Sequence, residues 1–207
     1  MVPALVRATL IIALCVLCSG VAEAQKSPPT PLTGLPTVPK TLPLIGGALT
    51  GSPDGSVAQA AASGDADDVV ALVDDGNDLD GPDRHGRTPL MYSAILNSGY
   101  IAGFLLQHGA RLDLRDSAGY TALHWAAERG SVAVMRLLLS FHAPVNLPNA
   151  RGLTPLMLAA SNNRTDAVRL LLENHADPRI TDYTGRDALS WTGDHAVVAA
   201  LLKASMH

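Results

Sequence analysis

Apolar and turn-forming residues recur along most of the chain with a constant spacing. Gly86, Gly119, Gly152 and Gly185 are evenly spaced, each thirty-three positions after the one before, and the leucine four positions after each glycine recurs with it. Leucine runs lie between these turns, at Leu105-Leu106, Leu137-Leu138-Leu139 and Leu170-Leu171-Leu172. Because one unit of this size cannot bury its own leucine stripe, the pattern predicts helical units that stabilise one another by stacking.

Each unit opens with a turn followed by the start of a helix, as in Asp116-Ser117-Ala118-Gly119-Tyr120-Thr121-Ala122-Leu123. The Asp bonds to the turn backbone, and the Gly supplies a positive φ. The Thr caps the helix that follows. A Pro at the first helical position is tolerated, because the backbone N–H that it lacks has no partner within the helix. The structural motif residues of these turns and helix starts are Gly86, Thr88, Pro89, Leu90, Gly119, Thr121, Leu123, His124, Gly152, Thr154, Pro155, Leu156, Gly185 and Leu189.

This period, together with a T-P-L-H-x-A core, resembles the ankyrin repeat. The unit 116–148 carries the core most fully, as Thr121-Ala122-Leu123-His124-Trp125-Ala126. The resemblance implies an all-α fold with short β-hairpin turns, a solenoid of about five helix-turn-helix repeats. Their approximate ranges are 50–82, 83–115, 116–148, 149–181 and 182–207. The first lacks the turn motif and the last is two residues shorter, as capping units are expected to differ.

Two departures from the family pattern concern histidines. The motif His, which in the family braces adjacent repeats through hydrogen bonds, is present only as His124. The Gly that ends the second helix is retained at Gly76 and Gly109 but is replaced by His142 and His175. Because a non-glycine residue is strained in a left-handed cap, we expect this array to be less stable than an idealised one.

The N-terminus has the features of a secretory signal peptide over residues 1–24. One basic residue precedes an apolar stretch, and Ala22-Glu23-Ala24 forms an A-x-A site with cleavage after Ala24. The alternative is an uncleaved anchor, although the apolar stretch is shorter than the roughly 20 residues that span a bilayer. Residues 25–53 hold seven prolines and are expected to be a disordered Pro/Thr-rich linker. The repeat domain then occupies 54–207.

Composition argues against most other chemistries. The net charge is −4, which disfavours nucleic-acid binding. Both cysteines, Cys15 and Cys18, lie in the predicted signal peptide, so we expect neither a disulfide scaffold nor a Cys-ligated zinc site in the repeats. The chain has no H-x-x-x-H pair, G-x-S-x-G elbow or phosphate loop. We therefore expect no enzyme activity, no cofactor and no metal.

The first repeat is strongly acidic. Residues 65–83 contain eight aspartates and no Lys or Arg. Clustered carboxylates suit Ca²⁺, but the EF-hand spacing is absent. The simpler interpretation is a polar outer face, with Asp65, Asp67 and Asp68 complementing a helix N-terminus.

Ligands of proteins that look like this one bind along the turn tips and the inner face of the first helices. We therefore expect a protein partner, with contacts from residues at those positions, because Arg, Tyr and Trp are common at the centres of interfaces. The predicted contact residues are Arg84, His85, Arg87, Ile95, Leu96, Tyr120, Trp125, Glu128, Arg129, Arg151, Leu153, Asn162, Tyr183 and Arg186. Residues 84–207 hold twelve bases and nine acids, so we expect an acidic patch on the partner.

The sequence thus resembles an exported ankyrin-repeat protein, most like those of the Gram-negative periplasm. The resemblance implies a monomer that binds, scaffolds or protects another envelope protein and does not insert into the membrane after signal cleavage. The alternatives are an immunity or inhibitor protein against a toxic enzyme, a secreted effector that binds a host protein and, more weakly, a calcium-binding module. The fold alone does not choose between them.

Overall fold

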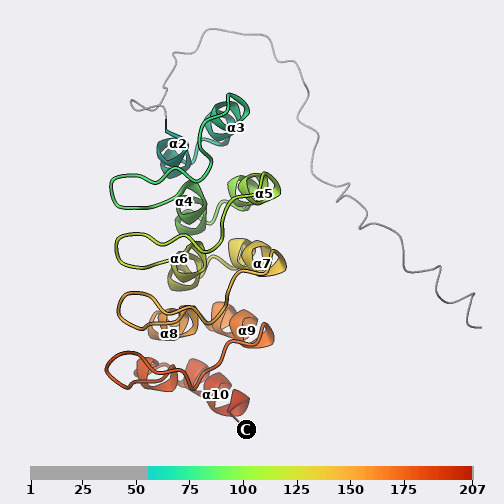
Figure 1. Ribbon diagram of the computed structural model, residues 1–207. Helices are drawn as coiled ribbons and strands as arrows, with labels where there is room; N and C mark the ends of the chain where they lie inside the picture. Colours follow the sequence, from blue (N-terminus) through green and yellow to red (C-terminus); the bar gives the residue numbers. More distant parts are fainter. Residues whose placement is uncertain (1–55, 207) are drawn as a thin grey trace, which may run out of the picture. The chain divides into compact units, whose positions relative to one another are not determined.

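The computed structural model describes residues 56–206, which form a stack of paired helices (Figure 1). The predicted signal peptide with Ala24 and the linker 25–53 lie outside the described residues. The helices are α2 (Val57–Ser63), α3 (Ala66–Asp74), α4 (Pro89–Ile95), α5 (Gly99–Gln107), α6 (Ala122–Arg129), α7 (Val132–Ser140), α8 (Pro155–Ser161), α9 (Thr165–Glu173), the 3₁₀ helix η1 (Leu189–Trp191) and α10 (Ala196–Ser205). The all-α class predicted from the repeat is confirmed.

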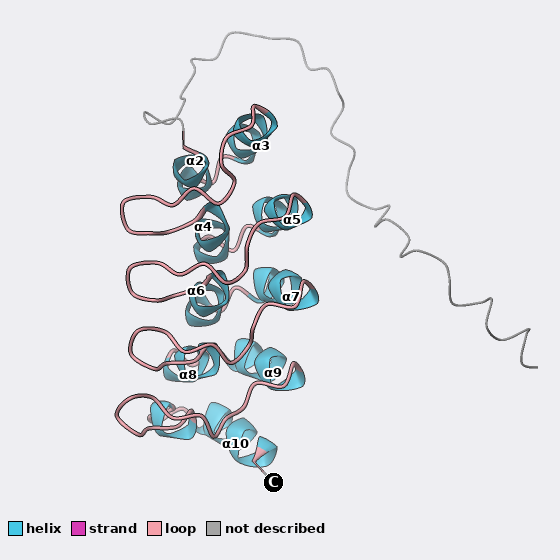
Figure 2. Cartoon of the chain, viewed as in Figure 1, coloured by secondary structure: helices cyan, strands magenta, loops and turns pink. Residues whose placement is uncertain are grey.

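The first helices of the repeats, α2, α4, α6 and α8, form one column, and the second helices form another (Figure 1). Long loops project from the column of first helices (Figure 2). We call their tips the finger turns and number the corresponding fingers 2 to 5; they are residues 83–87, 116–120, 149–153 and 182–186. In each, the backbone N–H of the first residue donates to the carbonyl of the fifth at 2.9 Å. The turns close in hairpin fashion, although residues 56–206 contain no strand.

The helix starts follow from the motif residues. Thr88 and Thr154 each accept a hydrogen bond from the backbone N–H three residues later, and a Pro occupies the first position of each helix. Asp65 caps α3 by accepting from the N–H groups of Asp67 and Asp68. The acidic residues that begin α3 therefore complement its N-terminus, as expected.

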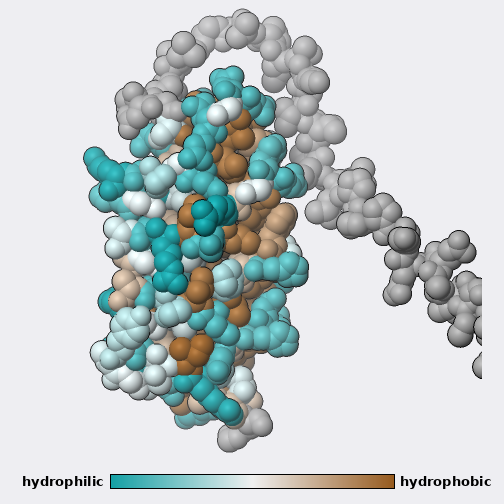
Figure 3. All heavy atoms as spheres, viewed as in Figure 1, coloured by the Kyte–Doolittle hydropathy of each residue, from teal (hydrophilic) through white to brown (hydrophobic). Residues whose placement is uncertain are grey.

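The core is aliphatic and follows the repeat spacing. Ala94, Ala126 and Ala159 are fully buried where neighbouring first helices pack, and their small side chains allow close approach. The second helices contribute fully buried leucines, Leu105, Leu138 and Leu171. Figure 3 shows mostly white and teal residues on the finger side of this face, and brown residues chiefly over the helices. The stacked repeats thus share one continuous core.

Two positions at the end of the second helices are strained. His142 and His175, which replace the usual glycine, both adopt φ +64°, whereas Gly76 and Gly109 adopt +85° and +89°. The prediction that these histidines occupy left-handed caps is confirmed. Each costs on the order of 1 kcal/mol relative to a glycine.

The last repeat departs from the helix-turn-helix pattern. Its first helix is reduced to the short 3₁₀ helix η1, and α10 begins at Ala196, two positions earlier than the repeat spacing from Thr165 would place it. Asp187 stands where other repeats have the capping Thr, and it accepts bonds from both the N–H and the hydroxyl of Ser190. The deletion leaves room for one short turn, and this end repeat thus differs from the inner ones, as expected of a capping unit.

Candidate functional site: the finger turns and their groove

The first residue of each finger turn organises the backbone behind it. Asp116 Oδ1 accepts from the N–H groups of Ala118 and Tyr120, both at 2.9 Å. The same two bonds, to the second and fourth residues after it, are made by Asp83, Asn149 and Asp182. A short polar side chain that accepts two local N–H bonds fixes the shape of the turn.

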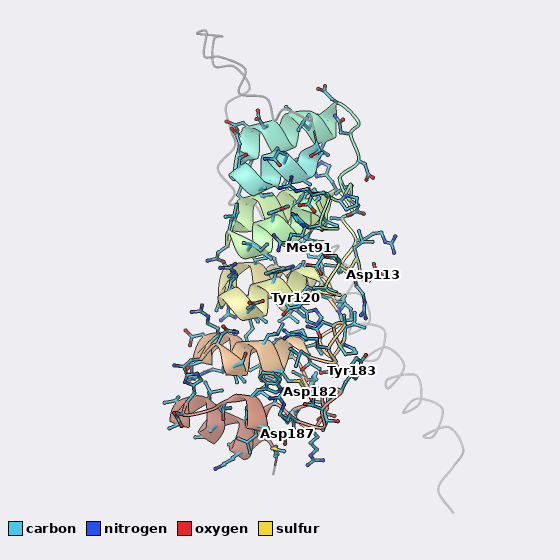
Figure 4. The ribbon with its side chains drawn as sticks, turned by 90° about the vertical axis from the view of Figure 1, so that its left-hand side faces the viewer. Met91, Asp113, Tyr120, Asp182, Tyr183 and Asp187 are labelled. Carbon is cyan, nitrogen blue, oxygen red and sulfur yellow. The ribbon has the colours of Figure 1, made fainter. Side chains whose placement is uncertain are left out.

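Adjacent fingers are joined by backbone hydrogen bonds. Ser117 N donates to His85 O at 3.0 Å, Ala150 N donates to Ala118 O at 3.2 Å, and Tyr183 N approaches Arg151 O at 3.4 Å. The fingers therefore form a connected row, which Figure 4 views face on with Tyr120, Asp182 and Tyr183 labelled. Such a row presents its side chains in fixed positions relative to one another.

An aromatic donor nine residues after the turn carboxylate closes three of the four finger turns in residues 56–206. Tyr92 OH donates to Asp83 Oδ2 at 2.6 Å, and Trp125 Nε1 donates to Asp116 Oδ2 at 3.0 Å. Trp191 Nε1 donates to Asp182 Oδ2 at 3.1 Å. In the remaining turn, finger 4, the corresponding residues are Asn149 and Leu158, and a leucine side chain cannot donate this bond. Each aromatic residue thus ties a finger to its own first helix.

These contacts keep the carboxylates of Asp83 and Asp182 ionised. Desolvation raises the pKa of Asp182, but hydrogen bonds from Thr184, Arg186 and Trp191 outweigh it and hold that pKa well below its usual range. Desolvation acts likewise on Asp83, where bonds from Tyr92, Arg87 and His85 lower the pKa overall. Fingers 2 and 5 therefore carry fixed negative charges beneath their tips at neutral pH.

Guanidinium groups lie over the same aromatic rings. The Arg87 guanidinium is 4.6 Å from the Trp125 ring centroid in the next repeat and 6.0 Å from that of Tyr92. Arg186 is 3.9 Å from the Trp191 centroid, and its Nε is 3.4 Å from Asp182 Oδ2. Arg151 Nη2 donates to the Tyr120 hydroxyl at 3.3 Å. The arginines of the row are thus held by intramolecular contacts, including favourable cation–π pairs.

The predicted contact residues separate by exposure. The exposed ones are Arg84, His85, Leu96, Arg129, Arg151, Asn162, Tyr183 and Arg186, and the half-buried ones are Arg87, Ile95, Trp125 and Glu128. Tyr120 and Leu153 are only 7% and 3% exposed. Both occupy the fifth position of a finger turn, as Arg87 and Arg186 do, but their side chains pack inward. The assignments of Tyr120 and Leu153 as surface contacts are corrected here.

Sequence reasoning did not include Tyr92 among the site residues. Its signal is the nine-residue spacing from a turn Asp to an aromatic donor, which recurs in Asp83–Tyr92, Asp116–Trp125 and Asp182–Trp191.

His124 braces two repeats beneath the fingers. Its Nδ1 accepts from the backbone N–H of Thr121 at 3.1 Å, which leaves the ring proton on Nε2 to donate to Leu153 O in the next repeat at 3.2 Å. The side chain is fully buried, and desolvation lowers its pKa to about 4. A neutral imidazole therefore joins finger 4 to α6, as the resemblance implied.

In the described part of the acidic first repeat, two of the carboxylates accept structural backbone hydrogen bonds. Asp80 accepts from the backbone N–H of Arg111 at 3.1 Å, and Asp65 is occupied as a helix cap. Over residues 56–206, no three His, Cys, Asp or Glu side chains converge as metal ligands. The calcium alternative gains no support from the described geometry. No helix of this same range is both long and apolar enough to cross a membrane.

Stacked helix pairs joined by projecting fingers define this chain as a helical repeat protein with an extended surface. A family model described as "Ankyrin repeats (3 copies)" matches residues 104–182 and again 134–206. A second, described as "Ankyrin repeat", matches residues 85–117. Together these matches cover more than half of the 207 residues, and the chain belongs to the ankyrin-repeat family. No curated protein matches it.

Proposed function

We propose that this protein is an exported, non-catalytic binding module that engages another protein of the cell envelope through its finger row. Ankyrin repeats support protein–protein interaction in general. The periplasmic location follows from the predicted signal peptide alone. The resulting role is to scaffold or protect the envelope partner.

The observation that carries the proposal is the row of finger side chains. Arg84, Arg151 and Tyr183 are exposed on fingers 2, 4 and 5, and Tyr183 is 75% exposed. A solvated turn gains nothing from a large aromatic side chain in water, whereas Tyr and Arg are the residues that anchor interfaces. The polar surface of the fingers suits a partner that associates and dissociates.

Rigidity supports this interpretation. The turn carboxylates, the finger-to-finger backbone bonds and the arginine–indole contacts hold the row before any partner arrives. A surface already in its binding conformation loses little conformational entropy on association. Affinity then depends on the exposed anchors, and the buried network keeps them in register.

The experiment is an affinity capture from envelope extract with the purified protein as bait. The test variant changes Arg84, Arg151 and Tyr183 to Ala, because all three are exposed. The matched control changes three exposed residues of the second helices, Arg136, Arg169 and Glu173, to Ala. Circular dichroism and urea unfolding check that both variants are folded.

One protein retained by wild type and by the control, but lost by the finger variant, supports the proposal. Retention by all three baits contradicts the finger assignment, since binding then uses another surface. Capture of nothing by wild type contradicts the proposed envelope partner.

A further inference from the structure

The arginines of the finger turns differ in whether a carboxylate of the chain pairs with them. Within residues 56–206 one of them forms an ion pair, Arg186, whose Nε is 3.4 Å from Asp182 Oδ2. The other three, Arg84, Arg87 and Arg151, have no carboxylate at ion-pair distance in this range. The positive charge of these three is therefore available to a partner.

Arg87 and Arg151 come from fingers 2 and 4 but converge on the aromatic pair of the finger between them. The Arg87 guanidinium is 4.6 Å from the Trp125 ring centroid, and the Tyr120 ring centroid is 4.9 Å from that same centroid. Arg151 Nη2 donates to the Tyr120 hydroxyl at 3.3 Å. Tyr120 lies in the middle of the row in Figure 4. Two guanidinium groups, one from each neighbouring finger, are thus held at finger 3.

The turn of finger 3 itself presents no long side chain. Its central residues are Ser117, Ala118 and Gly119, and the first two are exposed. Because these side chains are short, a segment of another protein can lie close to the backbone of finger 3. The cationic groups beside such a segment belong to the neighbouring fingers.

The carboxylates next to this position are already bonded. Asp83 Oδ2 accepts from the Tyr92 hydroxyl at 2.6 Å, and Asp116 Oδ2 accepts from Trp125 Nε1 at 3.0 Å. The other oxygen of each accepts two backbone N–H bonds within its own turn. Neither these carboxylates nor that of Glu128 on α6 forms an ion pair with an arginine of finger 2 or 4 in residues 56–206.

We propose that Arg87 and Arg151 form a two-arginine site that binds an acidic segment of the protein partner where it crosses finger 3. This inference rests on the proposed protein-binding function and deepens it. Arg151 is exposed and Arg87 is half-buried. A guanidinium held against a ring by its face keeps N–H donors along its edge, and that planar fork suits a carboxylate. Trp125 and Tyr120 are positioning residues, because they hold the two guanidinium groups in place.

Two fixed cations favour a partner segment with two carboxylates over one with a single carboxylate. Once the first carboxylate has bound one arginine, the second is held near the other arginine at a high effective concentration. Arg186 lies outside the site, because Asp182 already supplies its carboxylate. The chemistry of the partner segment is therefore a pair of Asp or Glu side chains at a matching separation.

The test is an NMR titration of the purified protein with acetylated, amidated peptides of alanine and glutamine that contain two, one or no glutamates. In the two-glutamate peptides the glutamates are separated by one, three or five residues, and an extended chain advances about 3.3 Å per residue. The reporter is the indole Nε1–H signal of Trp125. Trp191 is the internal control, because the guanidinium over its ring is the ion-paired Arg186. The chain has two tryptophans, so Trp125→Phe assigns both signals.

At low ionic strength, where exposed charges are least screened, one two-glutamate peptide should bind at least tenfold more tightly than the one-glutamate peptide. The Trp125 signal should shift saturably, the Trp191 signal should stay in place, and the peptide without glutamate should shift neither. The net charge of −4 does not by itself attract acidic peptides. Equal affinity for the one-glutamate and all two-glutamate peptides, or equal shifts of both indole signals, overturns the site.

The variants test the two arginines separately. Arg87→Gln and Arg151→Gln should each reduce the affinity for the two-glutamate peptide to that for the one-glutamate peptide. Arg186→Gln is the matched control and should bind as wild type does. Urea unfolding checks that all three variants are folded. Undiminished binding by the folded Arg151→Gln, or an equal loss in Arg186→Gln, overturns the two-arginine site.

The two proposals fail separately. If an envelope protein is captured through the fingers but Arg87→Gln and Arg151→Gln retain it at full affinity, the two-arginine site is wrong and the binding function stands. If the two-glutamate peptide binds at Trp125 while no envelope protein is captured, the site stands and the proposed envelope partner is wrong.

Discussion

Trp125 donates its indole N–H to the carboxylate of Asp116, nine residues earlier, at 3.0 Å, and so fastens finger 3 to helix α6. Asp116 is 8% exposed, and its other oxygen accepts two backbone N–H bonds. The ring of Trp125 also faces the Arg87 guanidinium of the preceding repeat. One side chain therefore couples the turn, the helix and the neighbouring finger.

Trp125→Phe should lower the free energy of unfolding by about 1–3 kcal/mol, because it leaves a buried carboxylate oxygen without its donor. The measurement is urea unfolding followed by circular dichroism. The double variant Asp116→Asn/Trp125→Phe reproduces the Asn149–Leu158 type of finger 4, and it should lose less than the single variant since no buried charge is left unpaired. Equal unfolding midpoints for wild type and Trp125→Phe would show that the indole bond contributes nothing.

Two glycines separate backbone strain from crowding between fingers. Gly119 and Gly185 adopt nearly the same φ, +78° and +80°. A Cβ on Gly119 would lie 2.5 Å from Ala150 N, whereas one on Gly185 would meet nothing within 4 Å. Gly185→Ala should therefore cost only the conformational strain, about 1–2 kcal/mol. Gly119→Ala should cost clearly more, because finger 4 must move and its bond to Ala118 O is disturbed.

Thermal and urea unfolding of the two glycine variants provide the comparison. A similar loss for both would mean that the fingers separate easily, and would contradict a rigid row.

Much of the fold follows from the sequence because its determinants are local and periodic. The turn Asp, the Gly, the capping Thr and the buried Ala recur at fixed positions, and each acts within a few residues of itself. The left-handed His142 and His175 were predictable because only the register is needed to place them.

The candidate site was predicted less completely, because exposure depends on which repeat lies alongside. Arg87 and Leu153 occupy the same position of their turns, yet Arg87 reaches over Trp125 while Leu153 packs into the core. The repeat motif predicts the same exposure for both residues, but the side chains around each one determine whether it lies at the surface or in the core. The first helix of the last repeat is likewise reduced to η1 because of the space that a two-residue deletion leaves, and helix propensities do not predict this effect.

His142→Gly and His175→Gly should each raise the free energy of unfolding, by about 0.5–1 kcal/mol, because both histidines are exposed with φ +64° and glycine removes strain at little cost in contacts. His108→Gly is the matched control, since His108 has φ −90° and its Nδ1 lies 2.8 Å from Phe104 O. That variant should be less stable than wild type. A lower urea midpoint for the two test variants would contradict the assigned strain.

The free energy of unfolding should decrease as the pH is lowered, because His124 titrates. Desolvation lowers the pKa of this buried imidazole from 6.5 to about 4, so the unfolded chain binds a proton that the folded chain excludes. Its contribution is therefore fully present above pH 6.5 and is lost as the pH falls from about 6.5 to 4, by up to about 1.4 kcal/mol per pH unit. Urea unfolding at pH 7, 6 and 5 measures this slope.

The control for that slope is His124→Gln, which lacks the titrating ring. The variant should be less stable than wild type at pH 7, because it loses the bond from His124 Nε2 to Leu153 O. The stability of the variant should change little between pH 7 and 5. The lowered pKa values of Asp83 and Asp182 act in a different window, since the stability they confer is lost only as the pH falls below about 4. An equal slope in both proteins between pH 7 and 5 would place the titration elsewhere and refute the neutral brace at His124.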